Sequence, residues 1–309
     1  MPGPVLEIEG LRKTYKGHLS LTSREVLKGL DLRIEESEVF GLLGQNGEGK
    51  TTTIKVILSL IFPDAGKIRI FGRDHRSVPI RRRIGFLPEN PYFYEYLTGR
   101  EFLSFYGQLF GYGGAERRRR ASDVLAKVGM SDRADLPLRK YSKGMLQRIG
   151  MAQALINDPD FVILDEPMSG LDPIGRREFR DIILELKSRG KTVFFTSHIL
   201  SDTEAVCDRV GILKEGRIGL SGRVSDLLSP AVRSWDVSFA GPAFEALRLD
   251  GLAASLISAR GRESLVRVDV QADLMRLLDA VRTAGGTLIS VAARRETLED
   301  LYLREVASR

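Results

Sequence analysis

A glycine-rich segment of eight residues has the composition and spacing of a phosphate-binding loop: Gly44-Gln45-Asn46-Gly47-Glu48-Gly49-Lys50-Thr51. Glycines let the backbone curl so that successive amides face one anionic chain. A helix predicted directly after the loop would add free N–H groups and the positive end of its dipole. The segment therefore predicts a site for the phosphates of a nucleotide.

Four side chains in and after this loop have distinct expected roles. Lys50 supplies a mobile cation for the β- and γ-phosphates, and the Thr51 hydroxyl is a hard oxygen ligand for Mg²⁺. The Thr52 hydroxyl can donate to a phosphate as well. Glu48 places a carboxylate among groups meant for anions, and like charges 4 Å apart in water repel by about 1 kcal/mol. We therefore expect the Glu48 side chain to point outward, so that its amide alone contributes.

An apolar segment at residues 161–164 ends in two acids, Asp165 and Glu166. Successive side chains of a strand alternate between its faces, so the two carboxylates can serve different tasks. Asp165 is predicted to hold Mg²⁺, and Glu166 to accept a proton from a water that attacks the γ-phosphate. Two acids that close a strand are often plain surface residues, but their place after a phosphate loop favours the catalytic role.

The elements that must position these residues follow a parallel α/β pattern. Nearly all-apolar strands are predicted at residues 39–43, 161–164 and 192–196, as in a sheet covered on both faces. A helix is expected after the loop, from Thr52 to Leu60, and another between Asp172 and Gly190. Alternating strands are expected at residues 5–9 and 26–34.

The organisation changes near residues 227–230. Short alternating strands at residues 264–270 and 287–291 flank an amphipathic helix that would bury Leu274, Leu277, Leu278 and Val281. We therefore expect a first domain at residues 1–228 and a small accessory α+β domain at residues 229–309.

Further motifs resemble those of the ATPase subunits of ABC transporters, and the resemblance covers roughly residues 4–225. Residues 141–148, Tyr-Ser-Lys-Gly-Met-Leu-Gln-Arg, stand where that family has its signature motif. Residues 169–172, Ser-Gly-Leu-Asp, are similar to its D-loop, and His198 to its switch histidine. Tyr15 precedes the loop, where the family has an aromatic residue that stacks on adenine.

The resemblance implies a fold of the P-loop NTPase type: an ABC nucleotide-binding domain with a mixed sheet core, an antiparallel β edge and a helical subdomain near residues 90–157. It implies hydrolysis of ATP with Mg²⁺. It also implies a head-to-tail dimer of two copies, in which Ser142, Gly144 and Asp172 contact the ATP held by the other copy. His198 would sense the γ-phosphate, although a core or surface histidine is the competing interpretation. For Tyr15, the competing interpretation is a tyrosine that packs against its neighbours and does not contact adenine.

Two departures from the family pattern bear on function. Lys143 and Met145 stand where the signature more often has glycine and glutamine, and Lys143 either adds a cation near the γ-phosphate or is solvated. Glu89 occupies the Q-loop position, where a carboxylate can approach Mg²⁺ or orient water but repels phosphate more than an amide does. Such variants are similar to the drug- and polysaccharide-export type, which pairs with a separate permease chain.

An aromatic segment at residues 90–97, Asn-Pro-Tyr-Phe-Tyr-Glu-Tyr-Leu, follows the Q-loop position. In the family this region receives a helix of the membrane permease, and exposed aromatic residues suit recognition of a helix in a groove. A staple onto the core is the alternative.

Composition limits the remaining choices. The net charge of +6 over 309 residues is mildly basic, and we interpret the arginine runs at 81–83 and 117–120 as solvated faces. A single cysteine, Cys207, fits a reducing compartment, and no run approaches the roughly 18 apolar residues of a bilayer span. We therefore expect a cytoplasmic protein, peripheral at the inner face of the cell membrane, that binds an integral membrane permease and no nucleic acid.

Two other functions compete with transport. One is a soluble ABC-type ATPase that acts on the ribosome or on nucleic acid, but such relatives usually carry two cassettes or large inserts. The other is a non-hydrolytic regulatory module, which the presence of Lys50, Asp165, Glu166 and His198 disfavours.

Overall fold

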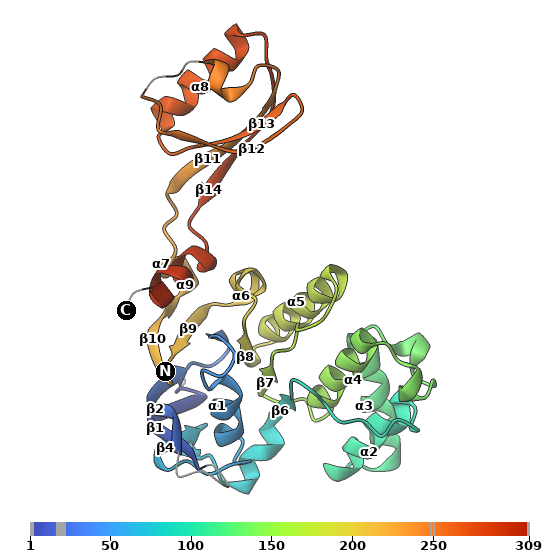
Figure 1. Cartoon of the computed structure of the whole chain (residues 1–309). Helices are drawn as coiled ribbons and strands as arrows, with labels where there is room; N and C mark the ends of the chain where they lie inside the picture. Colours follow the sequence, from blue (N-terminus) through green and yellow to red (C-terminus); the bar gives the residue numbers. More distant parts are fainter. Residues whose placement is uncertain (1–2, 17–22, 248, 250, 308–309) are drawn as a thin grey trace. The chain divides into compact units, whose positions relative to one another are not determined.

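The computed structural model describes residues 3–16, 23–247, 249 and 251–307, and the chain divides into two compact units (Figure 1). The N-terminal unit comprises Met1–Val224 together with Glu305–Arg309, and the C-terminal unit comprises Ser225–Arg304. Within the described residues, no helix is both long enough and apolar enough to cross a bilayer.

The central sheet of the N-terminal unit has the strand order β10-β9-β3-β8-β7-β6. From β9 to β6 its neighbouring strands are parallel, and β10 joins β9 antiparallel. Every residue of β3, β7 and β8 is buried, as the apolar runs predicted. The strands are β3 (Val39–Leu43), β6 (Ile84–Leu87), β7 (Phe161–Asp165), β8 (Thr192–Ser197), β9 (Arg209–Lys214) and β10 (Arg217–Arg223).

A second, antiparallel sheet has the order β2-β1-β4-β5 and covers one side of the central sheet. Its strands are β1 (Leu6–Lys16), β2 (Ser23–Ile34), β4 (Ala65–Ile70) and β5 (Arg73–Asp74). One hydrophobic cluster joins Leu27 of this sheet, Phe40 of β3 and Ile54 of helix α1. The loop before α1 is thereby held between the two sheets. Helix α1 spans Lys50–Ile57, so it starts earlier and ends earlier than predicted.

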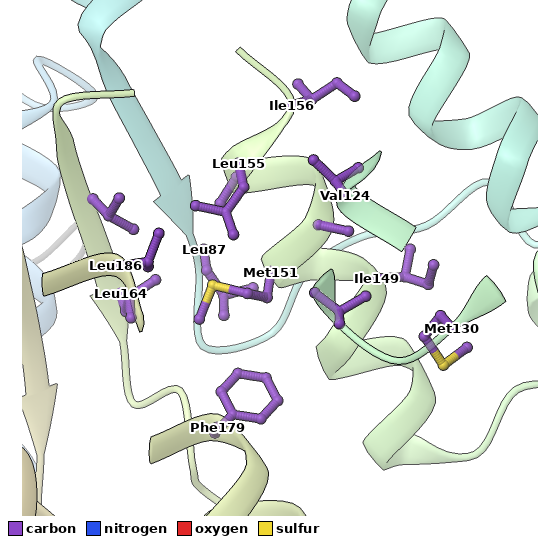
Figure 2. Packing of buried hydrophobic residues seen from close by; sticks show 14 of the residues in the cluster. Leu87, Val124, Met130, Ile149, Met151, Leu155, Ile156, Leu164, Phe179 and Leu186 are labelled. Atoms are coloured by element: carbon purple, nitrogen blue, oxygen red, sulfur yellow. The ribbon is translucent and has the colours of Figure 1, made fainter. Parts of the chain in front are cut away.

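Helices pack on the other side of the central sheet. Figure 2 shows their core, in which Leu87 of β6, Met151 of α4 and Phe179 of α5 lie in one cluster. Strand and helix approach closely here, because a Cβ on Gly85 would lie 2.1 Å from the Ala154 carbonyl oxygen. The helices are α2 (Gly99–Leu109), α3 (Gly114–Lys127), α4 (Lys143–Leu155), α5 (Pro173–Ser188) and α6 (Leu200–Val206), with 3₁₀ turns η2 (Ser131–Arg133) and η3 (Leu138–Lys140). A further 3₁₀ turn, η1 (Val78–Arg83), packs its Ile80 into the cluster of the antiparallel sheet.

Helix ends in this unit follow from their capping residues. Thr98 and Glu101 form a reciprocal capping box at the start of α2. The Asp172 side chain accepts a hydrogen bond from the Gly175 N–H, and Pro173 occupies the first turn of α5, as the sequence predicted.

The C-terminal unit is an α+β structure with the strand order β12-β13-β11-β14. Phe239, Val266 and Leu277 lie in its core, which joins the sheet to α8. The predicted strands and helix are present as β13 (Glu263–Val268), β14 (Thr287–Arg295) and α8 (Gln271–Thr283). The structure adds β11 (Val232–Ala240), β12 (Ala254–Arg260) and η4 (Phe244–Leu247). Helices α7 (Val224–Leu227) and α9 (Leu298–Ala307) each cross a boundary between the two units along the chain.

Candidate active site

The glycine-rich loop connects β3 to α1 and takes a shape that only glycine adopts easily. Gly47 has φ 89° and Gly49 has φ 113°, both in the left-handed region. A Cβ on Gly49 would also lie 2.8 Å from Cδ2 of Leu27. Gly49 is the N-cap of α1, so the first amides of that helix and the loop amides form one cradle.

Lys50 lies at the centre of a buried group of interactions. Its Nζ donates to the carbonyl oxygens of Gly44, at 2.6 Å, and Gln45, at 3.4 Å. The same Nζ lies 3.0 Å from Oε1 of Glu166, and both side chains are almost fully buried. The Lys50 cation is thus fixed between the loop and the predicted catalytic acid.

Asp165 lies next to the Thr51 hydroxyl, as predicted for two ligands of one ion. Its Oδ1 accepts hydrogen bonds from Oγ1 of Thr196, at 2.7 Å, and from Oγ1 of Thr51, at 3.3 Å. Burial raises the pKa of the Asp165 carboxyl above its ordinary value, and these two hydrogen bonds partly offset the rise. A carboxylate and a hydroxyl in contact form a set of hard oxygens that suits Mg²⁺.

Glu166 has φ 49°, a left-handed conformation that is uncommon for a residue with a side chain. Its N–H donates to Oγ1 of Thr196 at 3.0 Å, and its Oε2 lies 2.7 Å from Nδ1 of His198. Among the described residues, Oε1 accepts no hydrogen bond of good geometry, although it forms the ion pair with Lys50. That oxygen has the chemistry required to accept a proton from water.

These groups surround a pocket of about 590 Å³. Most of the predicted phosphate-loop residues line it, together with Glu89, Glu166 and His198; from the loop these are Gln45, Asn46, Gly47, Gly49, Lys50, Thr51 and Thr52. Arg24, Val26 and Ser169 line it as well. Arg24, Val26 and the supporting Thr196 carried no functional signal in the sequence. The first two contact the loop from the second sheet, and pairing of β8 with β7 brings Thr196 to the two acids, so no local motif contains them.

Glu48 points away from this pocket. Its Oε2 accepts a hydrogen bond from the N–H of Glu215 in the turn between β9 and β10. The carboxylate is thereby removed from the phosphate cradle, in agreement with the outward direction expected from charge repulsion.

Tyr15 lies at the end of β1, directly opposite Arg24 of β2 in the antiparallel register. Side chains of such a pair lie on the same face of the sheet. Tyr15 is 42% exposed and is not among the residues that line the pocket. Its stacking on adenine stays a prediction.

Ser142, Gly144 and Asp172 line a different pocket, of about 350 Å³. Oγ of Ser142 accepts a hydrogen bond from the Met145 N–H at the start of α4, so Ser142 caps that helix. The predicted residues that line pockets therefore form two groups, one around Lys50 and one around the start of α4, and Tyr15 belongs to neither.

This geometry defines a class of protein: a phosphate-loop nucleotide-binding protein whose loop faces two acids at the end of a strand in the same sheet. Comparisons with known proteins narrow the class. A family model described as ABC transporter matches residues 27–169. An ABC transporter ATP-binding protein of Nostoc sp. is 43% identical over 305 residues, which cover 98% of this chain and 90% of the relative.

A second relative and a solved structure indicate the same family. The daunorubicin resistance ATP-binding protein of Streptomyces coeruleorubidus is 32% identical over 98% of this chain and 96% of the relative. A dimeric ATP-binding cassette, solved in a post-hydrolysis state with ADP and phosphate, matches with a TM-score of 0.65 and 27% identity over 71% of this chain and 98% of the cassette. The chain belongs to the family of ABC transporter ATP-binding proteins and is an ATP hydrolase, which confirms the predicted fold class.

Asp165→Asn is expected to raise the melting temperature at neutral pH while it lowers hydrolysis of MgATP at least about tenfold. The raised pKa of Asp165 means that its ionised form is disfavoured by folding. The free energy of unfolding of the wild type therefore falls as the pH rises from the ordinary carboxyl pKa through the raised pKa of Asp165. Asparagine removes that charge, and its Oδ1 can still accept from Thr196 and Thr51. For a folded unit of roughly 150–250 residues, each kcal/mol gained in the free energy of unfolding raises the melting temperature by about 2–4 °C.

Thermal denaturation at several pH values and phosphate release test this prediction. The difference in melting temperature is expected to narrow as the pH is lowered. Asp181→Asn, which changes an exposed carboxylate on α5, is the matched control. A lower melting temperature for Asp165→Asn at every pH would contradict the destabilising effect of the buried charge.

Proposed function

We propose that this chain is the ATP-hydrolysing subunit of an exporter and that it drives transport through a separate integral membrane permease. The observation that carries the hydrolytic part is the buried ion pair of Lys50 and Glu166 beside the phosphate loop, with the exposed His198 in contact with Glu166. Export is supported by the family relationship and by the Streptomyces relative, which is named for resistance to daunorubicin. The permease would hold the cargo, which this chain does not identify.

The residues of the pocket support a division of labour in hydrolysis. Lys50 binds the β- and γ-phosphates, and Glu166 accepts the proton of the attacking water through its oxygen atoms. His198, held against Glu166, lies where it can contact the γ-phosphate. Thr51 and Asp165, with Glu89 at the pocket wall, would hold Mg²⁺. When bound, the ion would neutralise charge on the phosphates.

The second pocket supports a dimer of two copies. Ser142 and Gly144 lie at the start of α4, where free amides and the helix dipole favour an anion. In a head-to-tail pair, this helix start and the loop that contains Asp172 would close over the ATP of the other copy. A dimeric cassette among the solved relatives supports this arrangement.

The aromatic segment at residues 90–97 supports docking on the permease. Tyr92 and Tyr96 are 85% and 83% exposed, whereas Phe93 packs against Phe102 with ring centroids 5.3 Å apart. Phe93 therefore staples the loop onto the core, whereas the exposed Tyr92 and Tyr96 would be available to a helix of the permease. The segment directly follows Glu89 of the nucleotide pocket. A partner bound there could respond to the nucleotide, with this chain cytoplasmic and peripheral at the membrane.

A pull-down from detergent-solubilised native membranes with ATP tests the proposal. The tagged protein is expected to recover a polytopic membrane protein, and Tyr92→Ala/Tyr96→Ala to lose most of it with an unchanged melting temperature. Phe62→Ala, which removes a 70% exposed aromatic ring outside the segment, is the control. Recovery of ribosomal or nucleic-acid proteins without a membrane partner would overturn the transport function and leave ATP hydrolysis standing.

A further inference from the structure

Arg24 faces the nucleotide pocket from the start of β2, on the sheet opposite the predicted catalytic acids. It lines the pocket together with Val26, two residues further along the strand. Residues two apart in a strand share a face, so β2 presents a guanidinium and an apolar side chain to the same space. Arg24 is a second cation of this pocket besides Lys50, and the phosphate-loop motif does not include it.

The environment of Arg24 leaves its charge available to a ligand. Its Nη2 donates to the Gly47 carbonyl oxygen at 3.3 Å, which is a neutral acceptor. In the part of the chain that the structure describes, no carboxylate lies within ion-pair distance of Arg24, and the residue is exposed. The hydrogen bond to Gly47 holds one nitrogen of the guanidinium, while the exposed residue lines the pocket.

The direction of a bound nucleotide follows from the two ends of the pocket. Glu166 contacts the loop at Lys50, and the attacked γ-phosphate must lie at that carboxylate. Arg24 contacts the loop at Gly47. Because the phosphates follow the loop amides, the base extends away from Glu166, toward the wall formed by Arg24 and Val26. Tyr15, paired with Arg24 across the two strands, lies on the same face.

We propose that Arg24 contacts the purine base of the nucleotide through the face of its guanidinium and thereby contributes to the choice of base. The proposal rests on the ATP-hydrolysing function proposed above. A planar, weakly hydrated guanidinium packs well on an aromatic ring, and a purine offers more ring surface than a pyrimidine. Arg24 thus strengthens the binding of ATP more than that of CTP.

The test compares the KM for ATP with the KM for CTP in wild type, Arg24→Ala and Arg24→Lys. For Arg24→Ala, the KM for ATP is expected to rise about five- to tenfold and that for CTP to rise less, which lowers the preference for ATP. Arg24→Lys keeps the charge without the planar group and is expected to lose most of the same preference. Lys28→Ala, which removes a cation of β2 that does not line the pocket, is the matched control and leaves both values unchanged.

Equal rises for both nucleotides would overturn the proposal, because they would show that Arg24 only braces the loop through Gly47. Unchanged values would overturn it as well. If the wild type released no phosphate from ATP, the proposed hydrolytic function would fail by itself. Equilibrium dialysis with ADP and CDP then measures the same ratio, and an unchanged ratio in Arg24→Ala would reject the base contact independently.

Discussion

Glu166→Gln is expected to lower the rate of ATP hydrolysis at least about a hundredfold while ATP binding persists. Glutamine has the shape of glutamate but cannot take up a proton at neutral pH. The backbone N–H of residue 166 would still donate to Oγ1 of Thr196, so the geometry of the strand end is retained. The change also removes the negative charge that lies 3.0 Å from Lys50, so that this cation no longer has a competing partner for the phosphates.

Phosphate release and light scattering at saturating ATP check this prediction. We expect the variant to accumulate as an ATP-bound dimer, because two copies close on ATP and cannot hydrolyse it. Glu185→Gln, on an exposed part of α5, is the control and should hydrolyse ATP normally. Hydrolysis at the wild-type rate would exclude Glu166 as the base. A variant that stays monomeric with ATP would instead reject the sandwich dimer.

Lys50→Ala is expected to weaken ATP binding about ten- to a hundredfold and to lower the melting temperature. Hydrogen bonds from a charged donor contribute about 1.5–3 kcal/mol each, and Lys50 is the buried cation of the phosphate loop. The variant also leaves Glu166, which is 6% exposed, without its cation, and an unpaired buried charge is strongly destabilising.

Calorimetric titration with ADP and thermal denaturation measure the two effects. Lys55→Ala, which removes an exposed lysine from the same helix, is the control. In Lys50→Ala/Glu166→Gln the buried charge is gone as well, so the melting temperature is expected to recover while ADP binding stays weak. A double variant no more stable than Lys50→Ala would show that the ion pair does not carry the stability loss.

Local patterns in the sequence predicted the parts of the site that lie close together along the chain. The phosphate loop, the two acids and the capped start of α5 each depend on a few consecutive residues, and the structure has them at the predicted positions. Thr196 depends instead on the pairing of β8 with β7, and Arg24 on the contact of β2 with the phosphate loop at Gly47, and no local pattern contains either contact. The left-handed backbone of Glu166 is likewise set by packing around the strand end.

The C-terminal unit was predicted in part. Strand β13 and helix α8 have clear periodicity and were predicted, whereas β11 and β12 were not. In strand β12 the two large apolar residues, Leu256 and Ile257, are adjacent and so do not alternate with polar residues. Strand β11 lies in the middle of its sheet, and Ser238 separates its buried Val237 and Phe239. This alternation is the pattern that also marked β13, so β11 was open to prediction from the sequence.

One hydroxyl, that of Thr196, serves both acids: it donates to Asp165 and accepts from the N–H of Glu166. Two residues further along the same stretch of chain, His198 touches the Glu166 carboxylate. A displacement of β8 along its own axis would therefore move Asp165, Glu166 and His198 out of their present alignment in a single movement. The positions of these three side chains therefore depend on one strand end, and a partner that shifted β8 would change all three together.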